Sequence, residues 1–278
     1  MRYSVLIVIM FILVGRPLMA QKGEIPSSPT NQAPNKSQTQ KPVWELGIEM
    51  SSIAYKEPGV MSQKGTMFGL AGSYCDSAQK LRIEGRFSQG EVDYDGALAD
   101  DTPIKISNIP DYLLELRVLA GIHSWEAKTH PTLYVGFGYR YLNDNASLVS
   151  PYGYERESNY MYLPLALEMT HSVTISNQPR TLWTTLEYDY LLNGKQVSHL
   201  SDVDPGYSDI TNGQDSGSGW RASAKLDLEK ASIEVFTRFW NIKESYSSII
   251  YYDGVPDDLG IEPDNRSKEI GLKITTRF

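Results

Sequence analysis

The stretch that decides the fold is the carboxyl-terminal decapeptide, Glu269-Ile270-Gly271-Leu272-Lys273-Ile274-Thr275-Thr276-Arg277-Phe278. In an extended strand its apolar residues and Thr276 fall on one face, and its charged residues, Gly271 and Thr275 fall on the other. Strands of membrane-spanning barrels alternate in this way, because one face meets lipid and the other meets a polar lumen. Any half-buried strand shares the period of two, so an ordinary edge strand ending in Phe278 is the alternative.

The amino-terminal segment indicates export. Arg2 precedes an apolar run from Val5 to Val14, Pro17 follows, and Ala20 is a small residue at a plausible cleavage point. This pattern predicts a secretory signal peptide over residues 1–20, whose apolar run is too short to span a bilayer. No later run approaches the roughly eighteen apolar residues of a membrane helix. An exported chain of alternating segments is therefore expected outside the cytoplasm.

The rest of the chain divides into a leader and one domain. Residues 21–42 are rich in Pro, Ser, Gln, Asn and Lys and lack apolar periodicity, which predicts a disordered periplasmic leader. Residues 43–278 contain ten strand candidates: 43–55, 66–75, 80–94, 111–122, 132–142, 160–172, 181–192, 219–229, 231–246 and 266–278. The predicted fold class is therefore all-β, a transmembrane antiparallel up-and-down β-barrel of ten strands.

The connections between these candidates alternate in length. Short ones lie near 76–79, 123–131, 173–180 and 230, and longer ones lie near 56–65, 95–110, 143–159, 193–218 and 247–265. Barrels of the bacterial outer membrane have short periplasmic turns and long extracellular loops. An even number of strands then places both termini in the periplasm. The predicted location is the outer membrane of a Gram-negative bacterium.

Composition excludes several function classes. The formal net charge is −8, and removal of the signal peptide takes away Arg2 and Arg16 but no acid, which gives −10. Such a charge disfavours a nucleic-acid partner. The single cysteine, Cys75, cannot form an intramolecular disulfide. No phosphate-binding loop, paired-cysteine metal motif or Gly-x-Ser-x-Gly elbow is present, so no cofactor or metal is predicted.

The strand faces predict a filled lumen. The residues expected to point inward are Glu45, Glu49, Arg82, Glu84, Arg86, Glu115, Arg117, Arg140, Glu168, Glu187, Asp189, Arg221, Lys225, Asp227, Glu234, Arg238, Lys273 and Arg277. Acids and bases are nearly balanced in this set, and buried charges must pair to avoid a large desolvation cost. Open channels need about sixteen strands. A cross-linked interior is therefore expected in place of a general pore.

Aromatic residues gather near the predicted strand ends. The set is Trp44, Tyr74, Tyr94, Tyr141, Tyr160, Tyr190 and Tyr246. Aromatic rings with a polar tip suit the lipid headgroup boundary, so these residues are expected to form interfacial girdles. A sugar-binding platform would use the same residue types and is the alternative.

Two loops hold polar residues that could carry chemistry. The third strand runs into Asp93 and Asp95, and the seventh runs into a loop containing His199 and Asp202. Two close carboxylates raise one another's proton affinity, and a His–Asp pair can polarise a water as general base. Solvated acidic loop tips, or a surface calcium site, are the other interpretations, because acidic residues are common in exposed turns.

At this point the chain resembles the omptins, ten-stranded outer-membrane proteases with an active site above the membrane. The resemblance rests on Val92-Asp93-Tyr94-Asp95, on Asp204-Pro205-Gly206, on the hairpin from Tyr160 to Tyr190, and on the closing strand. It implies that Asp93 and Asp95 form one half of a water-activating site. The omptin His position falls on Asp202 and its Asp partner on Leu200, so the second half departs from the family pattern. A small loop shift would instead pair His199 with Asp202.

Three hypotheses of function follow. The first is an outer-membrane barrel whose extracellular loops serve binding, adhesion or envelope integrity without catalysis. The second is an omptin-like endopeptidase that uses Asp93, Asp95, His199 and Asp202 against basic peptide substrates. The third is a narrow channel for small solutes. The expected partners are membrane lipid, lipopolysaccharide (which the resemblance implies as an activating lipid) and the barrel-assembly machinery, reached through the strand ending in Phe278.

Overall fold

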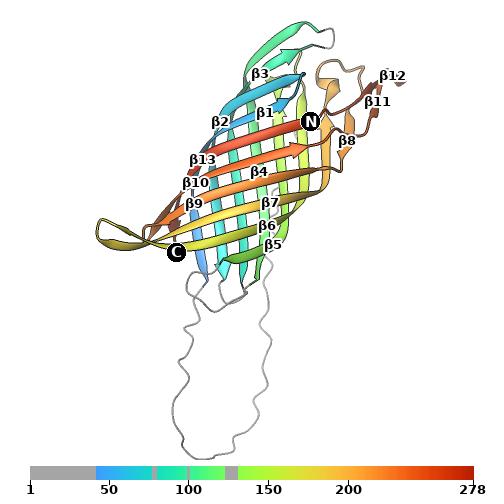
Figure 1. Ribbon diagram of the computed structural model, residues 1–278. Coiled ribbons are helices and arrows are strands. Elements are labelled where there is room, and N and C mark those ends of the chain that lie inside the picture. Colours follow the sequence, from blue (N-terminus) through green and yellow to red (C-terminus); the bar gives the residue numbers. More distant parts are fainter. Residues whose placement is uncertain (1–41, 77–79, 99–100, 123–130) are drawn as a thin grey trace, which may run out of the picture. The chain divides into compact units, whose positions relative to one another are not determined.

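A computed structural model describes residues 42–76, 80–98, 101–122 and 131–278 as one antiparallel barrel (Figure 1). Its ten strands are β1 (Val43–Glu57), β2 (Met61–Asp76), β3 (Leu81–Ala97), β4 (Pro103–Ile122), β5 (Thr132–Asn145), β6 (Glu155–Ile175), β7 (Gln178–Ser198), β9 (Gly217–Asp227), β10 (Ala231–Ile242) and β13 (Asn265–Arg277). Each pairs with the next in this order, and β1 pairs with β13 to close the ring. The predicted ten-stranded barrel is confirmed, whereas the signal peptide and leader lie outside the described residues.

One end of the barrel carries further structure, and we call it the long-loop end. It holds β8 (Ile210–Gln214), which extends the sheet beside β7, and a separate hairpin of β11 (Ser248–Tyr252) and β12 (Val255–Gly260). Two short 3-10 turns, η1 (Ala146–Leu148) and η2 (Leu200–Asp202), complete it. Among the described residues, no helix has the length and apolar character needed to cross a membrane.

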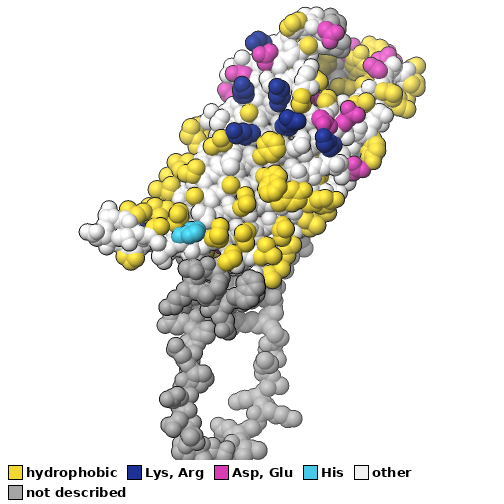
Figure 2. Space-filling view, in the orientation of Figure 1, with side chains coloured by type: hydrophobic (Ala, Val, Ile, Leu, Met, Phe, Trp, Pro, Cys, Tyr) yellow, Lys and Arg dark blue, Asp and Glu magenta, His cyan; other side chains and the backbone are white. Residues whose placement is uncertain are grey.

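An apolar belt surrounds the barrel wall, and Figure 2 shows part of it as a band of hydrophobic side chains. Every barrel strand contributes exposed apolar residues to it: Leu46, Ile48, Met50, Phe68, Leu70, Ile83, Phe87, Leu116, Val118, Leu133, Val135, Phe137, Leu163, Leu165, Leu167, Leu186, Tyr190, Trp220, Val235, Ile270, Leu272 and Ile274. Only a closed barrel satisfies every backbone N–H and C=O within hydrocarbon when strands cross it. The belt therefore marks the part of the wall that spans the membrane.

Between the belt and the long-loop end the two faces of the wall exchange polarity: the inward face becomes apolar and the outward face becomes polar. Beyond the belt, Ile53, Met67, Val92 and Ile109 point inward and form a buried apolar cluster, while polar residues face outward. The strands consequently continue farther than the sequence prediction, which followed outward-facing apolar residues. The loop predicted at 56–65 is wrong for this reason: only residues 58–60 separate β1 from β2, in a tight turn where Gly59 has φ of 84°.

The aromatic girdle is confirmed only in part. Trp44 and Tyr74 pack together near the short-turn end, with ring centroids 4.8 Å apart. Tyr160, in contrast, is buried and stacks on Trp240 at 6.1 Å inside the barrel. Tyr246 is 69% exposed beyond the belt, at the long-loop end. Tyr94 also points inward, where it packs against the buried cluster of Ile53, Met67, Val92 and Ile109. The prediction was wrong for these three tyrosines, because strand-end position alone does not reveal which face a ring occupies.

Candidate functional site

The lumen is crossed by ion pairs rather than lined by free charges. At its centre the Arg86 guanidinium contacts the carboxylates of Glu49 at 3.0 Å, Glu115 at 2.8 Å and Glu269 at 2.8 Å. Arg221, from β9, binds Asp189 at 2.7 Å and also contacts Glu115, so the two arginines share one acid. The predicted filled interior is confirmed at this level, since these groups meet from β1, β3, β4, β7, β9 and β13.

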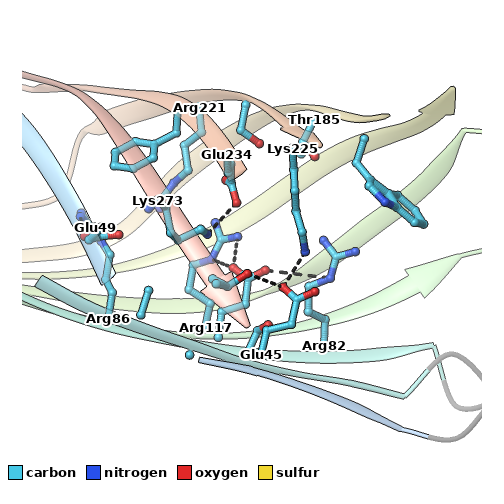
Figure 3. A pocket seen from close by; sticks show the side chains of 18 of the residues that line it. Glu45, Glu49, Arg82, Arg86, Arg117, Thr185, Arg221, Lys225, Glu234 and Lys273 are labelled. Carbon is cyan, nitrogen blue, oxygen red and sulfur yellow. Dashed lines mark hydrogen bonds and ion pairs between the residues drawn. The ribbon is translucent and has the colours of Figure 1, made fainter. Parts of the chain in front are cut away.

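Toward the short-turn end the lumen widens into a cavity of about 570 Å³. Figure 3 shows side chains of opposite charge converging on it from separate strands. Lys225 on β9 binds Glu45 on β1 at 2.6 Å, and Lys273 on β13 binds Glu234 on β10 at 2.7 Å. Because these charges are already paired with one another, the cavity wall presents little net field to a small charged solute.

The structure places Asp93 and Asp95 on the outer face of β3. Their neighbours Val92 and Tyr94 take the inward positions. The Asp93 carboxylate accepts the Asn108 N–H at 3.1 Å, and Asp95 forms an exposed ion pair with Lys105 at 2.8 Å. The two carboxylates therefore point away from the lumen, and their contacts link β3 to β4 within the hairpin.

His199 and Asp202 lie on the same short turn, but their side chains have separate partners. The ring of His199 sits between two carboxylates, with Nε2 3.1 Å from Glu157 and Nδ1 3.1 Å from Asp209. Asp202 instead accepts the backbone N–H of Glu155 at 2.9 Å. The four predicted site residues therefore form two separate groups. Asp93 and Asp95 contact the β3–β4 hairpin, whereas His199 and Asp202 contact the start of β6.

The surroundings of His199 favour its charged form. Partial burial opposes the charge, but the hydrogen bonds to Glu157 and Asp209 outweigh it and raise the pKa of His199 above its ordinary value. The pKa of Asp209 is lowered despite burial, since Ser201 donates to it at 2.7 Å and His199 lies beside it. An imidazolium held by two carboxylates ties β6 to the η2 turn, and both ring nitrogens are occupied.

The β11–β12 hairpin exposes several large apolar side chains beyond the belt. Its exposed large apolar side chains are Ile249, Tyr251, Tyr252, Val255, Leu259 and, just after it, Ile261. Asp253, Asp257 and Asp258 are exposed on the same hairpin. The connections at 199–215 and 244–264 together contain ten acidic residues and no Lys or Arg. We call the hairpin and these two connections the acidic rim.

A group of basic residues faces outward between the belt and the long-loop end. Lys56 pairs in register with Arg266, and Lys64 and Lys268 flank Ala54 from either side, so β1, β2 and β13 bring the four together. All four side chains are exposed, and Asp93 on β3 bounds the group opposite Lys64. Figure 2 shows such Lys and Arg side chains above the hydrophobic band. We call this group the basic patch.

The basic patch and the acidic rim were not predicted as sites. The patch could have been found by counting along the strands, because Lys64 shares its face with Phe68 and Leu70, and Lys268 shares its face with Ile270 and Leu272. The rim hairpin shows no comparable signal, since its strands lie within a segment read as loop. Within the described ranges, no group of three or more His, Cys, Asp or Glu side chains is arranged to hold a metal ion.

The chain is similar to outer-membrane proteins of known structure. The protease OmpT of Escherichia coli matches with a TM-score of 0.49 and 8% identity, over 87% of this chain and 98% of OmpT. Neisserial surface protein A matches with a TM-score of 0.35 and 9% identity, over 84% and 97%. Ail of Yersinia pestis, solved with the heparin analogue sucrose octasulfate, matches with 0.33 and 10%, over 86% and 100%. With identities of 8–10% and TM-scores below 0.5, no activity follows from the likeness. No family model and no curated protein matches the chain.

Proposed function

We propose that the protein is a bacterial outer-membrane barrel that binds cationic, partly apolar protein segments at its acidic rim. In this proposal both termini are periplasmic and the long-loop end is extracellular. The observation that carries it is the rim hairpin, where exposed Ile249, Tyr251 and Leu259 lie beside exposed Asp253, Asp257 and Asp258. Exposed apolar groups surrounded by charge are typical of protein-binding surfaces.

The rest of the molecule supports a binding role. The central lumen is occupied by the Arg86 and Arg221 networks, which leaves the wall and the rim as the accessible surfaces. Glu262 and Asp264 are paired with Arg156 and Lys243, whereas the exposed Asp253, Asp257 and Asp258 form no ion pair among the described residues. Such free acids attract cationic partners over a distance of about 10 Å at ordinary salt. The endopeptidase alternative would need Asp93 and Asp95 to act with His199, and their contacts join them to different neighbours. The channel alternative would need the ion pairs across the lumen to separate.

Rim binding is tested with a fluorescent library of Lys- and Arg-rich peptides that also contain Leu and Trp. We expect these peptides to bind the protein in detergent and to bind less tightly as salt increases. The double variant Tyr251→Ser, Leu259→Ser should weaken binding by about tenfold or more, since buried aromatic and aliphatic anchors carry most interface energy. Fluorescence anisotropy measures the affinity.

The matched control removes exposed apolar groups from another loop. Leu148→Ser, Val149→Ser should leave the affinity unchanged, because Leu148 ends η1, Val149 follows it, and both lie outside the rim. Equal weakening in both variants would contradict the proposal. Mass spectrometry of the incubated peptides, with lipopolysaccharide present, separates binding from cleavage: intact peptides are expected, and cleavage that His199→Ala abolishes would establish the endopeptidase instead.

We also propose that the basic patch binds phosphate groups of lipopolysaccharide. Its position next to the membrane belt is where lipid headgroups lie, and each Lys or Arg near an anionic membrane contributes about 1 kcal/mol. Arg266→Glu, Lys268→Glu removes two positive charges and adds two negative ones, so it should weaken binding to lipopolysaccharide vesicles by at least about 2 kcal/mol, roughly thirtyfold. Flotation of the refolded protein with vesicles measures this, and Lys195→Glu, on β7, serves as the control. Equal flotation of both variants would contradict the assignment.

The closing strand supports recognition by the barrel-assembly machinery, which we propose as the route of insertion. Phe278 is 73% exposed, and its backbone N–H donates to the Trp44 carbonyl at 3.0 Å. The terminal aromatic side chain thus stays accessible while its backbone continues the β1–β13 seam.

A further inference from the structure

Two buried carboxylates face one another near the long-loop end of the lumen. Asp111 on β4 and Asp144 on β5 are paired in register, and both take inward positions. Directly opposed residues on neighbouring strands have Cβ atoms about 4.5–5.5 Å apart. Asp111 is 7% exposed, and the Oδ1 atoms of both residues are buried without a hydrogen-bond partner. Buried polar atoms are almost always paired, so these two oxygens require an explanation.

The two carboxylates and Arg156 line a small cavity of about 40 Å³, whose wall also includes Ile53, Val92 and Leu142. Gln63, Ser158 and Gln196 contribute further polar groups to it: Gln63 donates from Nε2 to Asp144, and Ser158 donates to Gln196. A single water needs only about 10–15 Å³ of such space. The cavity can therefore hold an ion together with a water. Rotation of the Gln63 amide would exchange its nitrogen for an oxygen without moving other atoms.

The charges around the cavity do not balance. Arg156 is engaged by two other acids, Glu57 at 2.7 Å and Glu262 at 2.6 Å. Arg156 also lines the cavity and acts on Asp144, and Arg140 acts on Asp111. Asp111, Asp144, Glu57 and Glu262 thus face two guanidinium groups, and with all four carboxylates ionised two negative charges are in excess. Uncompensated buried charge is strongly unfavourable, so a bound species of charge +2 would stabilise this part of the barrel.

We propose that Asp111 and Asp144 bind a divalent cation of the calcium type in this cavity. Calcium prefers oxygen ligands from carboxylates, amides and waters in a flexible arrangement. The carboxylates of Asp111 and Asp144, the amide oxygen of Gln63 and the hydroxyl of Ser158 supply that chemistry from β2, β4, β5 and β6. The ion would join these four strands beneath the rim, outside the peptide-binding surface proposed above.

The test is a calcium titration of the mature protein, folded in detergent free of lipopolysaccharide and stripped with EDTA. Lipopolysaccharide is left out because its phosphates bind calcium themselves. Isothermal calorimetry should show one calcium per barrel, and the urea midpoint of unfolding should rise with calcium. Asp111→Asn, Asp144→Asn keeps the side-chain shapes and should abolish both effects. Asp93→Asn, Asp95→Asn, which changes two exposed carboxylates, should abolish neither.

Two results would overturn the proposal. The first is a wild-type titration without binding in protein shown to be folded by its heat-shifted gel mobility. In that case a carboxylic-acid C=O band in the infrared spectrum, absent from the double variant, would show that Asp111 and Asp144 share protons instead. The second is unchanged calcium binding by folded Asp111→Asn, Asp144→Asn. If the double variant does not fold, Asp144→Asn alone provides the same comparison.

Discussion

Replacement of Arg86 by Met is expected to destabilise the barrel by about 3–5 kcal/mol, because removing one partner from a buried ion pair leaves the other charge uncompensated. Arg86 is almost fully buried and is the shared partner of Glu49, Glu115 and Glu269. Of these, Glu115 retains Arg221, and Glu269 retains Arg238 at 3.1 Å. The three acids would then have to share two arginines, Arg221 and Arg238.

Unfolding in urea, followed by heat-shifted mobility and tryptophan fluorescence, measures this loss. The matched control is Lys105→Met, which removes the exposed ion pair with Asp95 and should leave the urea midpoint close to that of the wild type, because exposed ion pairs contribute little. Adding Glu269→Gln to Arg86→Met should restore part of the loss, since it removes one of the unpaired charges. Equal stability of Arg86→Met and the wild type would show that the network does not hold the barrel together.

The barrel could be predicted because each membrane-spanning strand carries two alternating patterns, apolar residues on one face and polar or charged residues on the other. Leu133, Val135 and Phe137 mark the lipid face, and Glu115 and Arg117 on the adjacent strand mark the lumen face, each with a period of two. Lipid outside and charge inside is a stricter condition than the single buried face of a soluble sheet. The predicted lumen residues accordingly have the predicted partners, such as Arg82 with Glu168 and Arg117 with Glu187.

Beyond the membrane the same rule fails, because water replaces lipid outside the wall. The apolar residues Ile53 and Met67 then belong inside, and the sequence carries no mark of where the change occurs. Asp93 shows the consequence for the candidate site. It follows the inward residues Arg82, Glu84 and Arg86 at an odd spacing, so strand parity places it outside, whereas the resemblance to the omptins placed it at an active site.

The pairing of distant loops is also invisible in the sequence. His199 contacts Asp209, which is ten residues away, and Glu157, which is forty-two residues away on β6. Neither spacing has a motif, because both contacts depend on how the long connection after β7 folds back over the start of β6. The sequence prediction paired His199 with Asp202, which lies three residues away on the same loop. In the structure, His199 contacts Glu157 and Asp209 instead.

Replacement of Trp240 by Ala is the second change expected to cost about 3–5 kcal/mol, as for other large buried aromatic residues. Trp240 is 2% exposed inside the barrel. It stacks on Tyr160, meets Tyr162 edge-on at 5.1 Å, and lies beneath the Arg140 guanidinium at 5.7 Å. Truncation would remove the largest member of the buried cluster that also contains Tyr160, Tyr162, Leu191 and Ile242.

Trp220→Ala is the matched control, because Trp220 is about half exposed on the membrane-facing wall and makes one edge contact with Tyr188. Its removal leaves no enclosed cavity, so urea unfolding should show a clearly smaller loss than for Trp240→Ala. Trp240→Phe keeps a ring in the cluster and should recover part of the stability. Equal losses for the two alanine variants would mean that the interior cluster contributes no more than the lipid-facing belt, and that the barrel is held chiefly by its strand pairing and its ion pairs.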